Sequence, residues 1–214
     1  MLTTDLIPAR DPASRRLMVV LHGLGDSMEG FRWMPAALKL PWMNFLLVNA
    51  PDDYYGGFSW YDFAGDPIPG IKRSRNLLFE LLDRMRAENY PSGETIVAGF
   101  SQGCLMTLEV GLRYPHRLAG LVGISGYAHE PETLVAEASP HGLAQKFLIT
   151  HGRHDTLVPF AAVKKQMEGL RQLGVGIDWR EFDKAHTIAG EEELSVIRDF
   201  IYSCYPAHNS PVPT

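Results

Sequence analysis

The segment Thr95-Ile96-Val97-Ala98-Gly99-Phe100-Ser101-Gln102-Gly103 decides both the fold and the chemistry that this sequence predicts. Its apolar first half, 95–98, predicts a buried β-strand, and the stretch that begins at Cys104 is compatible with a helix. A serine on a sharp strand-to-helix turn projects its hydroxyl above the sheet, and small flanking glycines give the backbone room to bend. The pentapeptide 99–103 is common by itself, so the rest of the chain must supply a base, an acid and an oxyanion hole.

Six short apolar runs predict the strands of one sheet. They are Leu17–Leu21, Phe45–Val48, Thr95–Ala98, Leu121–Ile124, Phe147–Thr150 and Ile177–Phe182. The first five are nearly continuous, which is typical of parallel strands covered by helices on both faces, whereas the sixth alternates like an edge strand. Amphipathic helical patterns lie between them, over 73–88, after Pro159, and from Glu191 onward. We therefore predict an α/β fold with a mostly parallel central sheet.

Length and composition favour one soluble domain over residues 1–214. We expect residues 1–15 to form an N-terminal extension or edge strand and residues 205–214 to form a flexible tail. The net charge of −5 offers no basic surface for nucleic acid. The first residues lack a secretory signal pattern, no apolar run is long enough for stable membrane insertion, and two cysteines suggest no disulfide framework, so a cytoplasmic location is expected.

A candidate acid and a candidate base each follow a predicted strand. Asp155 lies in the loop after the run 147–150, and His186 lies in the loop after the run 177–182. The carboxyl ends of parallel strands collect functional groups at one edge of the sheet, so both are expected near Ser101. Serine needs a base to remove its proton, and that base needs an acid to orient it. The order Ser, Asp, His is the one expected for α/β-hydrolases.

Other interpretations of these residues stay open at this point. Asp155 would also serve to cap the helix that begins near Pro159. His154 is a rival base, and a loop metal site would use His151, His154 and Asp155, although no further ligand cluster accompanies them. Cys104 is either a reactive thiol close to Ser101 or, as we favour, a small apolar residue packed in a helix.

The oxyanion hole is predicted from backbone amides. One donor is the amide that follows the nucleophile, at Gln102, and the second comes from the glycine-rich loop after the first strand, where we assign Leu24. An apolar pocket beside Ser101 is expected from aromatic and aliphatic residues of two loops. Its predicted members are Phe58, Trp60, Tyr61, Leu157 and Val158.

Taken together, four segments resemble the phospholipase/carboxylesterase family, which includes acyl-protein thioesterases. They are Leu21-His22-Gly23-Leu24-Gly25-Asp26, Ser59-Trp60-Tyr61-Asp62, Gly99-Phe100-Ser101-Gln102-Gly103 and His151-Gly152 with Asp155 and Val158-Pro159. The resemblance implies an α/β-hydrolase fold with little or no lid and a reaction that uses no metal or other cofactor. It implies cleavage of carboxylic esters or thioesters, in small molecules or acylated substrates, through an acyl-enzyme. Ser101, Asp155 and His186 fall on the family's nucleophile, acid and base, and Leu24 and Gln102 fall on its oxyanion amides.

Two departures from the family pattern concern substrate preference more than chemistry. Cys104 stands where the family usually has glycine, and Lys184-Ala185 replaces a glycine-rich approach to the histidine. The segment 127–145 is a further candidate for reshaping the acyl pocket. Lysophospholipase or peptidase activity, or a non-catalytic binding module on the same fold, remain alternatives. The acyl chain length and the choice between monomer and homodimer are left open by the sequence.

Overall fold

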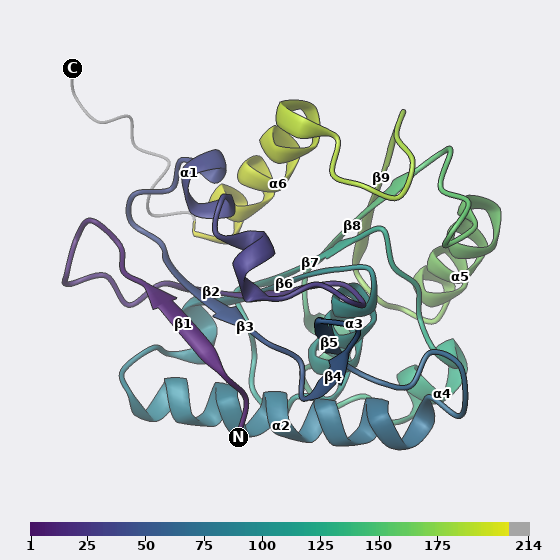
Figure 1. The fold of residues 1–214 in the computed structure, drawn as a ribbon, viewed down its shortest axis with the longest axis horizontal. Helices are drawn as coiled ribbons and strands as arrows, with labels where there is room; N and C mark the ends of the chain where they lie inside the picture. Colours follow the sequence, from purple (N-terminus) through teal and green to yellow (C-terminus); the bar gives the residue numbers. More distant parts are fainter. Residues whose placement is uncertain (206–214) are drawn as a thin grey trace.

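In the computed structural model, which describes residues 1–205, seven strands form one sheet in the order β1-β3-β2-β6-β7-β8-β9 (Figure 1). The strands are β1 (Thr4–Ile7), β2 (Leu17–Leu21), β3 (Asn44–Val48), β6 (Thr95–Phe100), β7 (Gly120–Ile124), β8 (Phe147–Gly152) and β9 (Ile177–Phe182). Only the edge strand β1 is antiparallel to its neighbour, and the other pairs in this sheet are parallel. The predicted mostly parallel sheet is therefore confirmed.

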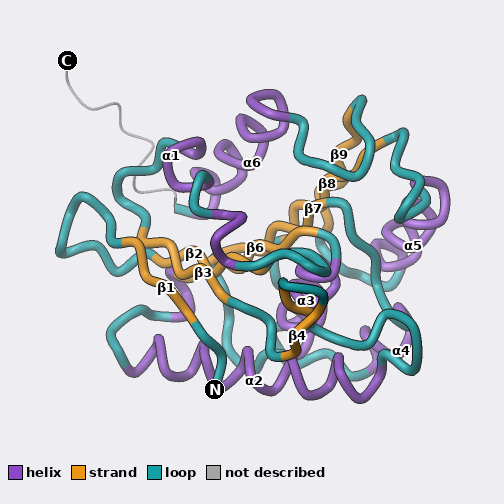
Figure 2. Tube along the Cα trace, viewed as in Figure 1, coloured by secondary structure: helices purple, strands orange, loops and turns teal. Residues whose placement is uncertain are grey.

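Helices cover both faces of the sheet, as Figures 1 and 2 show. One face carries α1 (Met34–Leu38) and α6 (Gly190–Cys204). The other carries α2 (Ile68–Ala87), α3 (Gln102–Arg113), α4 (Pro131–Ala136) and α5 (Phe160–Gln172). A small hairpin of β4 (Asp52–Tyr54) and β5 (Gly57–Ser59) lies outside the sheet, and short 3₁₀ turns cover Met28–Phe31, Ser92–Glu94 and Gly142–Ala144. Among residues 1–205, none of the helices combines the length and the apolarity that a membrane span requires.

The continuous apolar runs arise because each central strand is buried on both sides. In β2, Leu17, Val19 and Leu21 pack under the helices of the α2 and α3 face. Met18 and Val20 of the same strand pack under α1 and α6. All five side chains of β2 are buried, so neither face leaves a position for a polar residue.

All six predicted strands are present, while β6 and β8 each extend two residues beyond the predicted ends. The predicted helix over 73–88 begins earlier, at Ile68. The N-terminal stretch contains the edge strand β1, one of the two alternatives expected there. Most of the predicted flexible tail, residues 206–214, lies outside the described residues, whereas Tyr205 is only 6% exposed and belongs to the core.

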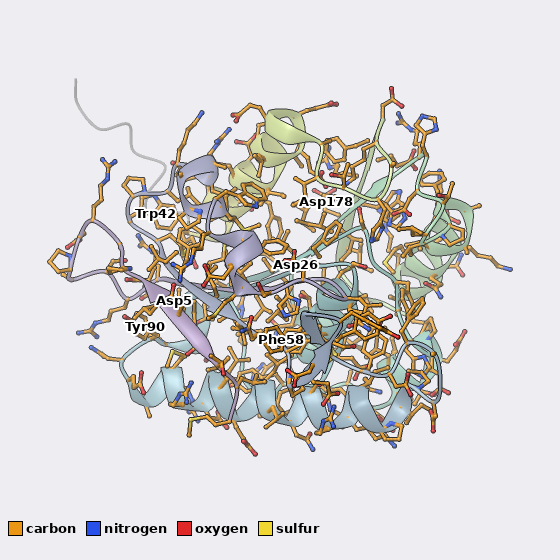
Figure 3. The ribbon with its side chains drawn as sticks, in the orientation of Figure 1. Asp5, Asp26, Trp42, Phe58, Tyr90 and Asp178 are labelled. Carbon is orange, nitrogen blue, oxygen red and sulfur yellow. The ribbon has the colours of Figure 1, made fainter. Side chains whose placement is uncertain are left out.

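The sheet ends at β9 in a strand with charged residues at alternate positions. Asp178 and Arg180 are exposed and form an ion pair of 2.8 Å on one side of the strand. Glu181, on the other side, accepts a hydrogen bond of 3.0 Å from the indole of Trp179. Asp178 is labelled in Figure 3. The alternating pattern seen in the sequence is therefore that of an edge strand, as predicted.

Two helix glycines provide a test of how tightly the layers are packed. A methyl group on Gly111 of α3 would overlap the side chain of Leu121 and come within 2.6 Å of the ring of Phe147. A methyl group on Gly169 of α5 would meet nothing within 4 Å. We expect Gly111→Ala to destabilise the protein by about 1–3 kcal/mol through overpacking. Gly169→Ala, the matched control, should stabilise it by roughly 0.5–1 kcal/mol. Urea unfolding of both variants measures this, and equal shifts would contradict the packing described here.

Candidate active site

Ser101 lies at a sharp turn between the end of β6 and the start of α3. Its backbone has φ 56° and ψ −113°, a conformation that non-glycine residues rarely adopt. A side chain at Gly99 would overlap the carbonyl of Gly103 and come within 2.7 Å of the Thr107 hydroxyl. A side chain at Gly103 would overlap the carbonyl of Leu21 in β2. Both glycines of the pentapeptide are therefore required by close backbone approach, and the turn raises the serine hydroxyl above the sheet edge.

The structure brings Ser101, His186 and Asp155 into one hydrogen-bonded row. The Nε2 atom of His186 lies 3.0 Å from the Oγ atom of Ser101. The Nδ1 atom of the same ring lies 2.7 Å from the Oδ2 atom of Asp155. Asp155 is buried, while the imidazole is partly accessible from the pocket. Because a carboxylate only accepts hydrogen bonds, Nδ1 carries a proton and Nε2 is left to accept the proton of the serine hydroxyl.

The second oxygen of Asp155 is held by backbone amides. Oδ1 accepts hydrogen bonds from the amides of Leu157 and Val158, at 3.1 and 2.8 Å. Helix α5 begins only at Phe160, so Asp155 closes a turn before the helix and does not cap it. These bonds fix the carboxylate plane, which in turn fixes the orientation of the His186 ring.

Two other histidines lie close to Asp155 in the sequence, and their hydrogen bonds go to groups other than Ser101. His154 is exposed and its Nε2 atom is 2.6 Å from Asp183 Oδ1 at the surface. His151 is buried, and its Nε2 atom donates to the carbonyl of Val158 at 2.9 Å. Burial lowers the pKa of His151, which keeps this ring neutral at pH 7. Within residues 1–205 no three or more His, Cys, Asp or Glu side chains form a group that could hold a metal ion.

Leu24 and Gln102, the residues assigned to the oxyanion hole, both line the pocket around Ser101. The Leu24 amide donates to no acceptor within residues 1–205. The Gln102 amide occupies the first position of α3, where helix amides have no partner in their own helix. Within residues 1–205, two backbone donors without an acceptor therefore line the pocket beside the serine.

The side chain of Gln102 has a structural task that the sequence did not reveal. Its Oε1 atom accepts from the amide of Trp60 at 3.0 Å, and its Nε2 atom donates to the carbonyl of Tyr61 at 3.1 Å. The indole of Trp60 donates to the carbonyl of His22 at 2.9 Å, and Ser74 of α2 donates to the carbonyl of Trp60. The segment 59–61 thus ties the start of α3 to the loop after β2, which bears Leu24.

His22 stabilises that loop from within. Its Nδ1 atom donates to the carbonyl of Gly23 at 2.6 Å, and its Nε2 atom accepts from the amide of Ala50 at 3.0 Å. Burial lowers the pKa of His22, so both bonds persist with a neutral ring at pH 7. The ring thus connects the end of β2 to the end of β3 through two hydrogen bonds.

The pocket at Ser101 has a volume of about 370 Å³. Of the predicted pocket residues, Tyr61, Leu157 and Val158 line it, together with Phe63, which was not predicted, and Tyr127 of the segment 127–145. Phe63 and Leu157, which line this pocket, are 63% and 74% exposed. The Tyr61 and Tyr127 hydroxyls lie 3.0 Å apart, so the segment 127–145 contributes to the wall through Tyr127.

The prediction that Phe58 and Trp60 line the pocket is wrong. Trp60 is fully buried, and its bond to the His22 carbonyl turns the indole into the core. Phe58 belongs to β5, where its backbone bridges to Asp26 and its ring packs near His22. Sequence proximity to the pocket does not settle the direction of a side chain, which here follows from the hydrogen bonds of the backbone and the indole.

Cys104 is buried in the first turn of α3, as the apolar interpretation predicts. The thiol fills space left by two glycines, because a side chain at Gly123 would come within 2.6 Å of its Sγ atom and one at Gly126 would overlap its Cβ atom. Burial raises the pKa of Cys104 to about 12. The thiol therefore stays protonated at neutral pH, and the thiolate that a nucleophile requires does not form.

A buried ion pair holds the loop that carries His186. The Nζ atom of Lys184 lies 2.6 and 2.8 Å from the two carboxylate oxygens of Glu193 in α6, and the side chains are 2% and 0% exposed. Glu193 also accepts a hydrogen bond of 2.7 Å from the amide of Ala189. The carboxylate thus binds the loop on both sides of His186. In the sequence, Lys184 stands out only as a departure from the family pattern.

The parallel sheet, the strained serine turn and the Ser101–His186–Asp155 row define an α/β-hydrolase. A model of the phospholipase/carboxylesterase family matches residues 3–205, and the chain belongs to this family. It is 33% identical over 159 residues to acyl-protein thioesterase 1 of Schizosaccharomyces pombe, which covers 66% of this chain and 69% of the relative. It is 27% identical over 214 residues to acyl-protein thioesterase 1 of Yarrowia lipolytica, with 91% and 94% covered. The crystal structure of esterase PE8 superposes with a TM-score of 0.81 at 29% identity, over 95% of this chain and 99% of that one.

We expect Glu193→Ala to destabilise the protein by about 3–5 kcal/mol, because it leaves the Lys184 ammonium buried without a counter-charge. Glu192→Gln, one position away and exposed, is the matched control and should change stability by less than about 0.5 kcal/mol. Urea denaturation at pH 7 measures both. A Glu193→Ala protein as stable as the control would show that the pair does not hold the loop.

Proposed function

We propose that this protein is a serine hydrolase that cleaves carboxylic esters or thioesters through an acyl-enzyme intermediate. The observation that carries the proposal is the row from Ser101 Oγ through His186 to the buried Asp155, open to a pocket beside two unpaired backbone amides. The family membership and the relatives named as acyl-protein thioesterases and esterase support the same reaction class.

In the proposed acylation step, Ser101 Oγ attacks the acyl carbon as its proton moves to His186 Nε2. The carbonyl π pair moves to oxygen, and the amides of Leu24 and Gln102 donate to the oxyanion that forms. The tetrahedral intermediate then collapses, the C–O or C–S bond breaks, and the leaving oxygen or sulfur takes the proton from His186. Asp155 stabilises the imidazolium through its bond to Nδ1 without taking its proton.

Deacylation repeats these steps with water as the nucleophile. Water attacks the acyl carbon of the ester on Ser101 and gives its proton to His186 Nε2. Collapse of the second tetrahedral intermediate breaks the bond between the acyl carbon and Oγ, and the proton returns to Ser101 as the carboxylic acid leaves. Each group that these steps need is a side chain or an amide of this chain, so the proposal includes no cofactor.

The acyl group is proposed to occupy the pocket of about 370 Å³ lined by Tyr61, Tyr127 and Val158. These walls are mainly apolar and bind alkyl groups by removing their surface from water. Each methylene contributes roughly 1–3 kcal/mol at most, so discrimination between chain lengths is gradual.

A fluorophosphonate probe tests whether Ser101 is the nucleophile. We expect stoichiometric labelling of Ser101 in the folded protein, identified by peptide mass spectrometry. His186→Ala should lower kcat by about 10⁴-fold or more. His154→Ala, which removes the surface histidine of the neighbouring loop, should stay within about twofold of the unchanged protein. Loss of activity in His154→Ala instead of His186→Ala would contradict the assignment of His186 as the base. A folded protein in which Ser101 is not labelled would contradict the proposal that the protein is a serine hydrolase.

A panel of substrates with matched acyl groups tests the reaction class. We expect p-nitrophenyl esters and acyl thioesters to turn over at kcat/KM values at least about 10²-fold above those of the corresponding peptide amides. Released p-nitrophenol, thiol and amine are measured directly. Faster cleavage of the amides would replace the esterase proposal with the peptidase alternative.

A further inference from the structure

A second cavity begins where the pocket at Ser101 meets His186. It has a volume of about 390 Å³ and shares Asp26, Phe100 and His186 with the first pocket. Its further walls include Phe31, Trp33 and Leu194, so it lies between the loop after β2 and the start of α6. The imidazole ring of His186 is therefore a wall of both cavities.

The position of the second cavity matches that of a leaving group. In the proposed reaction His186 Nε2 passes its proton to the leaving oxygen or sulfur, which must therefore lie on the histidine side of the acyl carbon. The pocket at Ser101 holds the oxyanion amides and the apolar acyl walls. The cavity beyond His186 is then the space into which the rest of the alcohol or thiol extends.

Aromatic rings form a row from His186 along this cavity. The ring centroids of His186 and Phe100 lie 5.0 Å apart, those of Phe100 and Phe31 lie 6.5 Å apart, and those of Phe31 and Trp33 lie 6.4 Å apart. Trp33 is 41% exposed at the outer end. The faces of such rings carry partial negative charge and attract cations, tryptophan most strongly.

Asp26 places an exposed carboxylate at the junction of the cavities. Its Oδ1 atom accepts a hydrogen bond of 2.7 Å from the amide of Ser27, and its Oδ2 atom accepts none within residues 1–205. Both oxygens lie against Gly30, where a side chain would overlap them. Within the described chain Asp26 forms no ion pair with a lysine or arginine. The described residues that line the second cavity include no lysine and no arginine. Figure 3 shows Asp26 on the side of Phe58 that faces α1 and α6.

We propose that the second cavity binds the leaving group and favours an alcohol or thiol that carries a positively charged amine. The inference rests on the proposed hydrolase function and adds the class of its leaving group. A quaternary or protonated amine placed over Trp33 and Phe31 would face the rings on one side and the carboxylate of Asp26 on the other. A neutral leaving group of the same shape receives the apolar contacts only.

Two thioesters with the same acyl group and leaving groups of equal shape test this proposal. They are S-butyrylthiocholine and S-butyryl-3,3-dimethylbutanethiol, in which a quaternary carbon replaces the quaternary nitrogen. The quantity measured is the ratio of their kcat/KM values, which cancels any general change in activity. We expect a ratio of roughly threefold to tenfold in favour of the cation at low ionic strength, decreasing as salt is added.

Asp26→Asn keeps an acceptor for the Ser27 amide and removes the negative charge. It should therefore lower the ratio of the two kcat/KM values toward one. Trp33→Leu keeps an apolar wall and removes the ring, and should lower the ratio by about twofold to threefold. Asp53→Asn is the matched control: this exposed carboxylate lines neither cavity, and the ratio should stay unchanged.

A ratio near one in the unchanged protein, or an equal ratio in the Asp26→Asn variant, would overturn the leaving-group assignment while the hydrolase function stands. Failure to cleave either thioester, with no labelling of Ser101 by the fluorophosphonate probe, would remove the proposed function and this inference with it. Thiol release, circular dichroism of each variant and probe labelling together separate these outcomes.

Discussion

The approach of the Leu21 carbonyl to the Cα atom of Gly103 is the constraint on which the rest of the site depends. It allows the first turn of α3 to lie directly against the end of β2. The loop that bears Leu24 and the turn that bears Ser101 thereby become neighbours, although they are far apart in sequence. Any side chain at position 103 would separate these two backbones and move the two candidate oxyanion amides apart. The absence of a side chain at Gly103 therefore determines both the exposure of Ser101 and the position of the Leu24 and Gln102 amides beside it.

Polar groups buried around this contact are satisfied by one another, and this explains the role of the aromatic segment 59–61. The amide of Gln102 faces the pocket while its side chain spans two backbone groups of that segment. Trp60 and His22 complete the connection to the loop after β2. A buried polar group without a partner costs about 1–3 kcal/mol, so each of these bonds penalises movement of the amides. The same logic applies to Glu193, which restrains the loop around His186.

The sequence predicts those parts of the structure that depend on local pattern. Continuous apolar runs identify the central strands, and Ser101, Asp155 and His186 stand out because each follows such a run. The hairpin β4–β5 and the short helices α1 and α4 are not predictable in this way, since three to six residues carry too little periodicity. The side-chain direction of Trp60 and the burial of Lys184 depend on partners distant in sequence or across a loop.

The charged residues of β9 disfavour edge-to-edge pairing of this strand with a strand of another molecule. A foreign strand added along this edge would have to desolvate Asp178 and Arg180, and it would cover the surroundings of Glu181. The opposite edge ends in β1, a strand of only four residues that offers a short row of free backbone groups. Growth of the sheet from one molecule into the next is therefore disfavoured at both ends. This arrangement favours solubility at high protein concentration, where exposed apolar strands would pair and aggregate.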